Sequence, residues 1–429
     1  MNTIKYLVLA ILSVFTMSIT SCKKDNVAEN DLFNKRSTVA ADYSQSSLPV
    51  VPISGAITSN TTWTADKVYE LSGIVTVKNG ATLTIQAGTY IKSSVNVAGS
   101  AANGVLVISK GAKLNALGEA SKPIVFTSRY LLDGNNSTLG KPGDFGGLIV
   151  LGRARINDPA GTKLIEGLPD TQDYYYGSNS DANNGESSGT IKYVRIEFGG
   201  YILKTDVEVN GLTLGGVGSG TTLNNVQVSW GLDDGFEFFG GRVNASDLIS
   251  FSNDDDQFDF DLGYQGTISN SISIANKVST HSASGTNSDS NGAEIDNHPS
   301  NFAALPKTIP TFNNVRIIGT EDENGIKAPG FKSGILVRRG AELSLNSSII
   351  TGYKTGLHIH TDATPAQTVV SESKIHGFTL SATIGYTDFG GNTISPIGAP
   401  APTYGITQPF FNKSGFNPNL AYTWSKFDY

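Results

Sequence analysis

A short repeat constrains the fold of this chain more than any other feature of the sequence. The segment Asn225–Ser229 (NVQVS) aligns with Asp247–Phe251 (DLISF) 22 residues later, and Gly235–Phe239 (GFEFF) aligns with Gln257–Asp261 (QFDFD) at the same offset. A fixed period of this length is typical of architectures in which each repeat buries its apolar face against the next repeat. The chain therefore has to be interpreted as a stack of similar units.

Further copies of the repeat follow, separated by insertions: Asn270–Ile274, Asn313–Ile317, Asn346–Ile350 and Ser373–His376. In a parallel β-helix, one coil holds about three short strands, and neighbouring coils lie about 4.8 Å apart. We predict an all-β fold, a single-stranded right-handed parallel β-helix with three strands and about 22 residues per coil and with capped ends. Val226 would then lie over Leu248, and Phe238 over Phe260. A β-propeller fits less well, because its repeat is about 40 residues long.

The two ends of such a stack expose strand edges that have to be covered. We expect Val50–Tyr69, with Trp63, to form the N-terminal cap. The aromatic segment Asn412–Tyr429, which includes Trp424, is expected to cover the other edge.

The N-terminus has the composition of an export signal. Lys5 precedes the largely apolar stretch Tyr6–Ile19, and the small residues Thr20 and Ser21 lead to Cys22. This order is typical of a secretory signal peptide, and the stretch is short for a membrane span, which needs about 20 apolar residues. We predict a signal peptide at residues 1–21, with a transmembrane anchor as the alternative.

Cys22 is the only cysteine of the chain, so an intrachain disulfide is excluded. The segment Ser18–Cys22 resembles the lipobox of bacterial lipoproteins, which implies a lipid on Cys22, and two or more acyl chains give lasting membrane attachment. The alternative is a free thiol beside an ordinary cleavage site. Residues 22–48 are polar and without periodicity, which predicts a flexible lipid-anchored tether, and residues 49–429 would form the β-helix domain. The membrane is thus an expected partner, and the expected location is the outer membrane, facing the periplasm or the cell surface.

The formal net charge of −7 and the lack of a basic stripe argue against nucleic-acid binding. Several motifs resemble those of the pectin-lyase-like right-handed β-helix lipoproteins of Bacteroidota: Thr61–Thr64, Gly80–Gly88, Lys122–Thr127, Gly143–Gly147 and Asp233–Gly241. The resemblance covers nearly the whole mature chain, and it implies the fold and a location in the cell envelope. It implies little chemistry, since a fold does not fix a function. Many β-helix proteins bind or cleave acidic polysaccharides, which is an analogy only.

Acidic residues recur in three aligned segments, Asp234–Glu237, Asp256–Asp261 and Asn291–Asp296. Side chains two residues apart in a strand lie on the same face of the sheet, and the equivalent strands of neighbouring coils lie side by side. Two columns of carboxylates are therefore expected, and we call them together the acidic ladder. The first column would hold Glu237, Asp259 and Glu294, and the second Asp261 and Asp296; Asp233, Asp234, Asp254, Asp255 and Asp256 would lie in the turns before these strands.

Stacked carboxylates repel one another, so a compensating charge is needed. Calcium (Ca2+) is the natural candidate, because it prefers six to eight oxygen ligands. The alternative is structural: Asp and Asn are common turn residues that bond to their own backbone. A catalytic role is a further alternative, since glycosidases use pairs of carboxylates. A calcium-dependent lyase would need a base such as Lys or Arg beside the calcium; Arg242, Lys277, Arg338 and Arg339 are available, and no motif singles one of them out.

Three weaker signals remain. His358 and His360, with Asp362, lie on one strand face by alternation and could bind a metal such as zinc, although outward polar residues explain them as well. Tyr174, Tyr175, Tyr176 and Trp230 are candidates for stacking on sugar rings, or for packing against the β-helix. The sequence therefore predicts an envelope lipoprotein that binds carbohydrate or another surface ligand, with calcium at the acidic ladder; the alternative is a calcium-dependent polysaccharide lyase or glycoside hydrolase that acts on acidic glycans.

Overall fold

The computed structural model describes residues 47–94, 104–135, 138–204, 207–275, 290–319, 331–363, 367–383, 385–396, 399 and 424–426. The chain divides into two units, residues 1–35 and 36–429, and all described residues belong to the second. The predicted signal peptide, Cys22 and all of the predicted tether before Ser47 lie outside the described residues. No helix among the described residues is long and apolar enough to cross a membrane.

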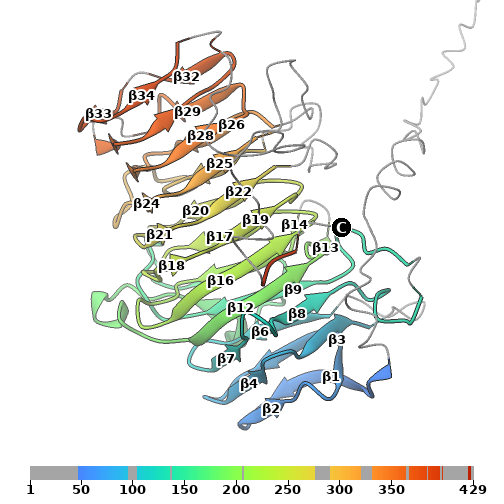
Figure 1. Ribbon diagram of the computed structural model, residues 1–429. Coiled ribbons are helices and arrows are strands. Elements are labelled where there is room, and N and C mark those ends of the chain that lie inside the picture. The colour runs from blue at the N-terminus through green and yellow to red at the C-terminus, as the bar shows by residue number, and fades with distance from the viewer. Residues whose placement is uncertain are drawn as a thin grey trace, which may run out of the picture. The chain divides into compact units, whose positions relative to one another are not determined.

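The described residues form a right-handed parallel β-helix, as predicted (Figure 1). Thirty strands join into one continuous sheet by parallel pairing from coil to coil, and this sheet folds into three faces, here called sheets 1, 2 and 3. Each strand pairs with the strand one coil later rather than with its neighbour in sequence, so the described strands of the three faces form no antiparallel hairpin. The parallel pairing explains why the repeat length is the length of one coil.

The strands follow three stacks. Sheet 1 contains β2 (Thr61–Trp63), β4 (Thr82–Gln86), β7 (Lys113–Leu117), the first halves of β12 (Gly189–Glu197) and β16 (Thr222–Ser229), β18 (Ala245–Ser246), β21 (Thr267–Ser269), β24 (Thr311–Asn313), β27 (Ser344–Asn346), β30 (Val369–Ser371) and β33 (Thr387–Asp388). Sheet 2 contains most of β1 (Val50–Ile57), the first half of β3 (Val68–Val77), β5 (Tyr90–Ser93), β8 (Ile124–Thr127), the second halves of β12 and β16, β19 (Ile249–Phe251), β22 (Ile272–Ile274), β25 (Arg316–Ile318), β28 (Ile349–Thr351), β31 (Lys374–Ile375) and β34 (Thr393–Ile394). Sheet 3 contains the ends of β1 and β3, β6 (Val105–Ile108), β9 (Gly147–Leu151), β15 (Leu212–Gly215), β17 (Phe236–Phe239), β20 (Phe258–Asp261), β23 (Ala293–Ile295), β26 (Ser333–Val337), β29 (Thr355–Ile359) and β32 (Leu380–Ala382).

Insertions between coils carry the remaining elements. They are the antiparallel pairs β10 (Lys163–Leu164) with β11 (Tyr175–Tyr176) and β13 (Ile202–Lys204) with β14 (Val207–Glu208), and the 3-10 turns η2 (Gln172–Tyr174) and η3 (Asp181–Asn183).

Columns of inward side chains fill the interior. Phe238 of β17 pairs with Phe260 of β20, and their rings stack with centroids 4.9 Å apart. Val226 lies over Leu248, because the next residues along, Gln227 and Ile249, are register partners. The predicted columns are therefore confirmed, and stacked aromatic pairs add about 0.5–1.5 kcal/mol each beyond the area they bury.

The corner before sheet 2 holds one residue in the left-handed backbone region in successive coils. Asn225, Asp247 and Asn270 have φ values of 53°, 56° and 50°, and Asn314 follows with 56°. Asn and Asp tolerate this conformation better than most residues. The register pairs Ser269 with Asn313, so Asn314, and not Asn313, is the equivalent of Asn270.

The later copies of the repeat were therefore predicted with the wrong register. The equivalent left-handed residues are Ser347, with a φ of 49°, and Glu372, also with a φ of 49°. The predicted starts at Asn346 and Ser373 are each displaced by one residue from these positions. Insertions between the coils hid the correct register, because they removed the constant 22-residue offset.

The two ends differ in how well they were predicted. Val50–Tyr69 forms β1, β2 and the start of β3, which pair into the stack as its first strands. Trp63 is 1% exposed and stacks on Tyr69 with ring centroids 4.8 Å apart, at the N-terminal end of the core. This segment is thus the first turn of the β-helix rather than a separate cap.

The described part of the C-terminal segment lies against the side of the β-helix (Figure 1). Trp424 packs edge-on against Tyr193 of β12 with ring centroids 6.0 Å apart. Gln227 of β16 exchanges two hydrogen bonds with the backbone of Lys426, at 2.5 and 2.8 Å. The expectation that this segment covers the last coil is wrong for residues 424–426, because Trp424 joins an apolar cluster on the flank that includes Val68.

Candidate functional site

The acidic ladder forms on the outward face of sheet 3. Glu237 of β17 pairs with Asp259 of β20, and Asp259 pairs with Glu294 of β23. The first predicted column of carboxylates is therefore present. The second column follows from the same register: Phe260 pairs with Ile295, so Asp261 and Asp296, one residue further on, also lie side by side.

The same two columns continue from acidic into basic residues. Glu294 pairs with Leu336 of β26, which pairs with His358 of β29. In sheet 3, Val337 pairs with Ile295 on one side and with Ile359 on the other. The residues that follow these three form the second column, so Arg338 lies between Asp296 and His360. Sheet 3 thus changes the sign of its outward charge between β23 and β26.

Two arginines neutralise the end of the acidic ladder. The Nε atom of Arg338 lies 2.8 Å from Oδ1 of Asp296, and its guanidinium also forms an ion pair with Glu294. Nη1 of Arg339 lies 2.7 Å from Oδ2 of Asp296. The sequence indicated that the carboxylates need compensation, but it did not identify Arg338 as the partner, because an insertion separates Arg338 from the acidic segments.

The turns before the ladder strands contain acids that bond from one coil to the next. Oδ1 of Asp234 accepts a hydrogen bond of 2.9 Å from the backbone N–H of Asp256, and Oδ1 of Asp256 accepts one from the backbone N–H of Asn291. Oδ1 of Asp255 accepts a 2.8 Å bond from the hydroxyl of Ser290. For one oxygen of each of these three carboxylates, the structural alternative of turn stabilisation is therefore realised.

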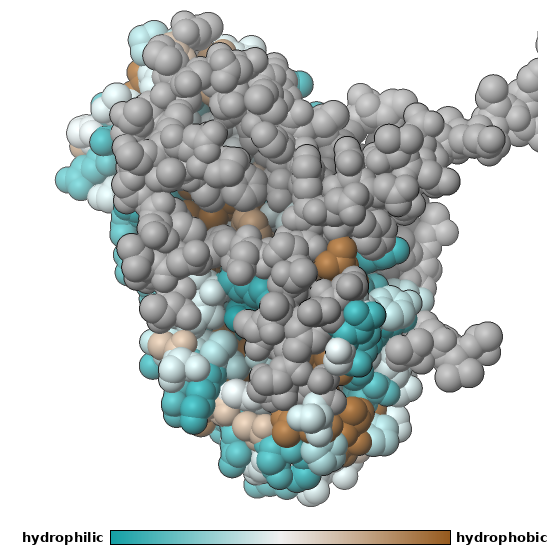
Figure 2. All heavy atoms as spheres, turned by 45° about the vertical axis from the view of Figure 1, so that its right-hand side comes forward, coloured by the Kyte–Doolittle hydropathy of each residue, from teal (hydrophilic) through white to brown (hydrophobic). Residues whose placement is uncertain are grey.

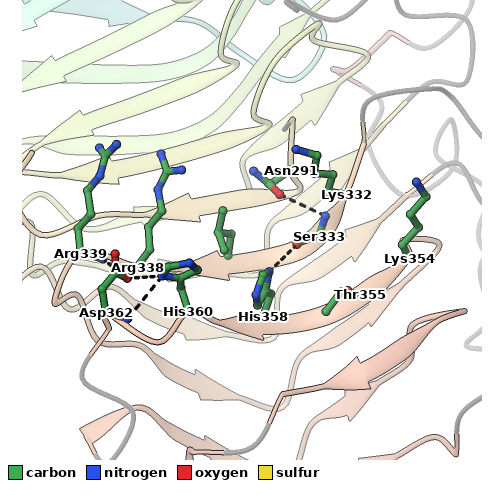
Figure 3. A pocket seen from close by; sticks show the side chains of 11 residues that line it. Asn291, Lys332, Ser333, Arg338, Arg339, Lys354, Thr355, His358, His360 and Asp362 are labelled. Atoms are coloured by element: carbon green, nitrogen blue, oxygen red, sulfur yellow. Dashed lines mark hydrogen bonds and ion pairs between the residues drawn. The ribbon is translucent and has the colours of Figure 1, made fainter. Parts of the chain in front are cut away.

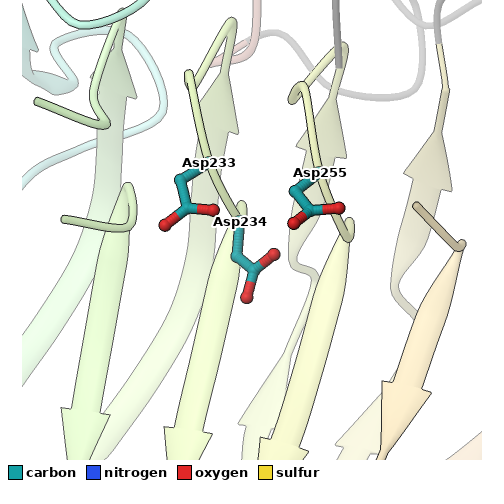
Figure 4. A group of neighbouring side chains, drawn as sticks. All are labelled: Asp233, Asp234 and Asp255. Atoms are coloured by element: carbon teal, nitrogen blue, oxygen red, sulfur yellow. The ribbon is translucent and has the colours of Figure 1, made fainter. Parts of the chain in front are cut away.

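Carboxylate oxygens also converge in three groups of three. Within each group, one ligand atom per residue lies within 4.8 Å of the others. The groups are Asp233, Asp234 and Asp255 (Figure 4); Asp234, Glu237 and Asp259; and Asp256, Asp259 and Glu294. Asp254, which is fully buried, and the pair Asp261 and Asp296 are in none of these groups.

Asp259 is the centre of this arrangement. It belongs to two of the three groups, and its Oδ1 atom is buried with no hydrogen-bond partner among the described residues. A buried carboxylate oxygen without a partner is costly. A cation bound between the groups would supply the missing interaction.

Four carboxyls of the ladder strands and the turns before them have strongly raised pKa values. Burial, and then the neighbouring carboxylates, raise the pKa values of Asp234, Glu237, Asp256 and Asp259 well above their ordinary range. Burial raises the pKa of Asp261 to about 7, against the opposing effect of a hydrogen bond from the backbone of Leu262. Without a bound cation, protons would relieve part of the repulsion near neutral pH.

Arg338 was one of the bases considered for a lyase. Burial alone would lower its pKa, but the adjacent carboxylates of Glu294 and Asp296 outweigh burial and raise it. An ion-paired guanidinium with a raised pKa is a poor proton acceptor. The geometry therefore gives Arg338 an electrostatic role.

His358, His360 and Asp362 lie close together on sheet 3 without forming one of the three-ligand groups found among the described residues. Nδ1 of His360 lies 2.7 Å from Oδ1 of Asp362, but His358, His360 and Asp362 do not bring three ligand atoms within 4.8 Å of one another. Burial, and then the neighbouring His360, lower the pKa of His358. Both imidazoles line a pocket on sheet 3 (Figure 3).

Two of the four aromatic residues proposed to stack on sugars are buried. Trp230 is 3% exposed and packs edge-on against Phe251, and Tyr176 is 1% exposed and packs against Phe239. The prediction of a stacking role is therefore wrong for Trp230 and Tyr176. The reason is that both rings fill apolar space beside the sheets.

The other two tyrosines are partly exposed and bonded to the protein. The hydroxyl of Tyr174 lies 3.1 Å from Oγ1 of Thr76, and the hydroxyl of Tyr175 donates to Asp170 at 2.9 Å. Tyr174 is the last residue of η2, and Tyr175 begins β11, the strand whose Tyr176 packs against Phe239 of the ladder strand β17. These two side chains remain candidates for sugar contact.

The comparison with protein families identifies the chain. Residues 55–393 match the model of the pectate-lyase like beta helix domain, which is most of the chain and includes every strand of the acidic ladder. The protein therefore belongs to this family, and its scaffold is a carbohydrate-related β-helix. No curated protein and no solved structure matches the chain.

Proposed function

We propose that this protein binds carbohydrate along the outward face of sheet 3, with calcium held by the acidic ladder. The observation that supports this proposal most strongly is the position of Asp259. It shares two groups of converging carboxylates, and its buried Oδ1 atom lacks a hydrogen-bond partner among the described residues. Both features fit a hard cation better than a turn.

The chemistry of the donors favours a hard cation such as calcium. All members of the three groups are carboxylates, which suit hard cations such as calcium and magnesium. Asp234, Glu237 and Asp259 would hold one ion, and Asp256 and Glu294 would act with Asp259 on the other side. The ion would supply positive charge and open coordination positions that sugar hydroxyls or carboxylates can occupy.

The outward side chains of sheet 3 offer hydrogen bonds to a sugar ligand. On the face of the molecule drawn in Figure 2, hydrophilic residues make up much of the coloured surface, and apolar residues occur in separate patches. The outward residues of sheet 3 change from carboxylates at Glu237 and Asp259 to Arg338, His358 and His360. A row of hydrogen-bonding groups on a rigid sheet can bind hydroxyls along an extended chain.

Attachment to the cell envelope is the second part of the proposal. It rests on the sequence of the N-terminus, where the apolar stretch and the small residues before Cys22 are typical of a lipoprotein signal. A lipid on Cys22 would hold the β-helix at the outer membrane, facing the periplasm or the cell surface. Glycans of the envelope or of the surroundings would then be within reach.

The alternative function is a calcium-dependent polysaccharide lyase or a glycoside hydrolase that uses the same face. Arg338, one of the bases considered for such an enzyme, is paired with Glu294 and Asp296 and has a raised pKa. These contacts favour binding over cleavage.

Glycan binding with and without calcium tests the proposal. Affinity electrophoresis through gels that contain neutral or acidic polysaccharides should show retardation, stronger with calcium than with EDTA. The variant Asp259→Asn should lose the calcium-dependent part, whereas Glu119→Gln, which removes an exposed carboxylate outside the ladder, should not. Unretarded migration in every gel would refute carbohydrate binding, and release of unsaturated or reducing sugars would support the alternative.

A further inference from the structure

A basic pocket lies on sheet 3 beyond the acidic ladder. It has a volume of about 590 Å³ and is formed by residues of β26 and β29 and the turns beside them. The strands β20, β23, β26 and β29 are consecutive in the stack. With about 4.8 Å between strands, the pocket lies roughly 10–14 Å from Asp259.

Cationic side chains dominate the lining of this pocket. Figure 3 shows Arg338 and Arg339 at one end and Lys332 and Lys354 at the other. Asp362 is the only carboxylate among the described residues of the lining. Its Oδ1 atom accepts a 2.9 Å hydrogen bond from the backbone N–H of Arg339 and contacts His360.

The two ends of the pocket have different partners. The arginines are bound to Glu294 and Asp296 of the acidic ladder, so much of their charge is compensated. Neither Lys332 nor Lys354 forms an ion pair with any residue that the structure describes. Both lysines are exposed, so the described residues at the lysine end carry an excess of positive charge.

Neutral hydrogen-bonding groups lie between the two ends. The hydroxyl of Ser333 is 3.5 Å from Nδ1 of His358, and Thr355 lines the pocket beside them. Ser333 is held in place, because its backbone N–H donates a 3.2 Å bond to the side chain of the buried Asn291. A ligand here would meet hydroxyl and imidazole groups next to the two ammonium groups.

We propose that this pocket is a metal-independent site for an oxyanion, a carboxylate or a sulfate ester, carried by a glycan on sheet 3. Lys332 and Lys354 bind the anionic group, and Ser333, Thr355 and His358 bind neighbouring hydroxyls. Charge-assisted hydrogen bonds of this kind are stronger than neutral ones. The inference rests on the proposed function, since it specifies the charge of the glycan that is bound there.

Titration calorimetry of the protein in EDTA tests this site separately from the acidic ladder. The three probes are an oligogalacturonate with carboxylates, an oligocarrageenan with sulfate esters and a neutral oligogalactan. At least one acidic probe should bind more tightly than the neutral one, and the one that does identifies the anionic group. Lys332→Gln and Lys354→Gln should each weaken this binding by about tenfold or more, whereas Lys113→Gln, an exposed lysine on sheet 1, should leave it unchanged.

The outcomes separate this inference from the proposed function. Equal binding of neutral and acidic probes, unaffected by the lysine variants, would overturn the oxyanion site and leave carbohydrate binding intact. Acidic probes that bind only when calcium is added would likewise overturn it and support the acidic ladder as the binding element. No binding of any probe, with or without calcium, would overturn both.

Discussion

Asp261 gives the most quantitative prediction, because its pKa is raised from 3.8 to about 7. The folded protein therefore holds a proton at Asp261 that the unfolded chain releases at lower pH. Stability from this group is fully present below the unfolded pKa near 4, and it is lost as pH rises through about 7. Three pKa units at 1.36 kcal/mol each correspond to about 4 kcal/mol of unfolding free energy, of which about 3 kcal/mol is lost between pH 5 and pH 8.

The variant Asp261→Asn removes this titration while its side-chain oxygen can still accept the hydrogen bond from Leu262. Urea unfolding in EDTA at pH 5 and pH 8, followed by tryptophan fluorescence, should show the variant gaining up to about 3 kcal/mol on the wild type as pH rises. Asp170→Asn is the matched control for the loss of one negative charge. If the wild type is as stable at pH 8 as at pH 5, or if Asp261→Asn shifts both values equally, the reasoning is refuted.

Three further predictions concern packing, compensation and attachment. Arg338→Met removes the guanidinium that is bound to Glu294 and leaves Asp296 with Arg339 as its cation, so it should lower the unfolding free energy at pH 7 by about 2–4 kcal/mol, measured by urea unfolding; an unchanged unfolding free energy would show that the ion pairs of Arg338 do not stabilise the fold. Phe260→Ala opens a cavity in the aromatic column and should cost about 3–5 kcal/mol, with Phe260→Leu as the milder control in the same assay. Cys22→Ala should move the expressed protein from the membrane fraction to the soluble fraction in cell fractionation, whereas Ser21→Ala should not; membrane retention of the cysteine variant would exclude lipid anchoring through this residue.

The fold was predictable because the repeat is both regular and chemically specific. Phe238 and Phe260 stand 22 residues apart, and their rings stack in the core. Between β17 and β20 no insertion interrupts the coil, so sequence offset and spatial register agree. Where insertions intervene, the prediction slipped by one residue, as at Asn313 and Asn314.

The candidate site was predictable only in part, for a related reason. The acidic ladder follows from alternation along β17, β20 and β23, and the register of Glu237, Asp259 and Glu294 was correct. The basic half of sheet 3 was missed, because Leu336 pairs with Glu294 across 42 residues of chain. No constant period remains over such a distance to align Arg338 with Asp296.

The sequence also did not allow us to predict that an aromatic residue at a corner between two sheets is buried. Trp230 has a left-handed backbone with a φ of 56°, so strand alternation does not apply to it. Its ring turns onto Phe251 instead of facing solvent. Predicting exposure at such corners requires the path of the neighbouring coil.

Calorimetric titration of the protein with calcium tests the central claim, that the acidic ladder is a cation site, most directly. The wild type should bind calcium, and binding should release protons, because the raised pKa values of the ladder carboxyls fall when the ion is bound. Replacement of Asp256, Asp259 and Asp261 by Asn should abolish the binding heat, whereas Asp170→Asn should retain it. A wild-type protein that binds no calcium, or a triple variant that binds it equally well, would contradict the account and leave the carboxylates with their role in the turns.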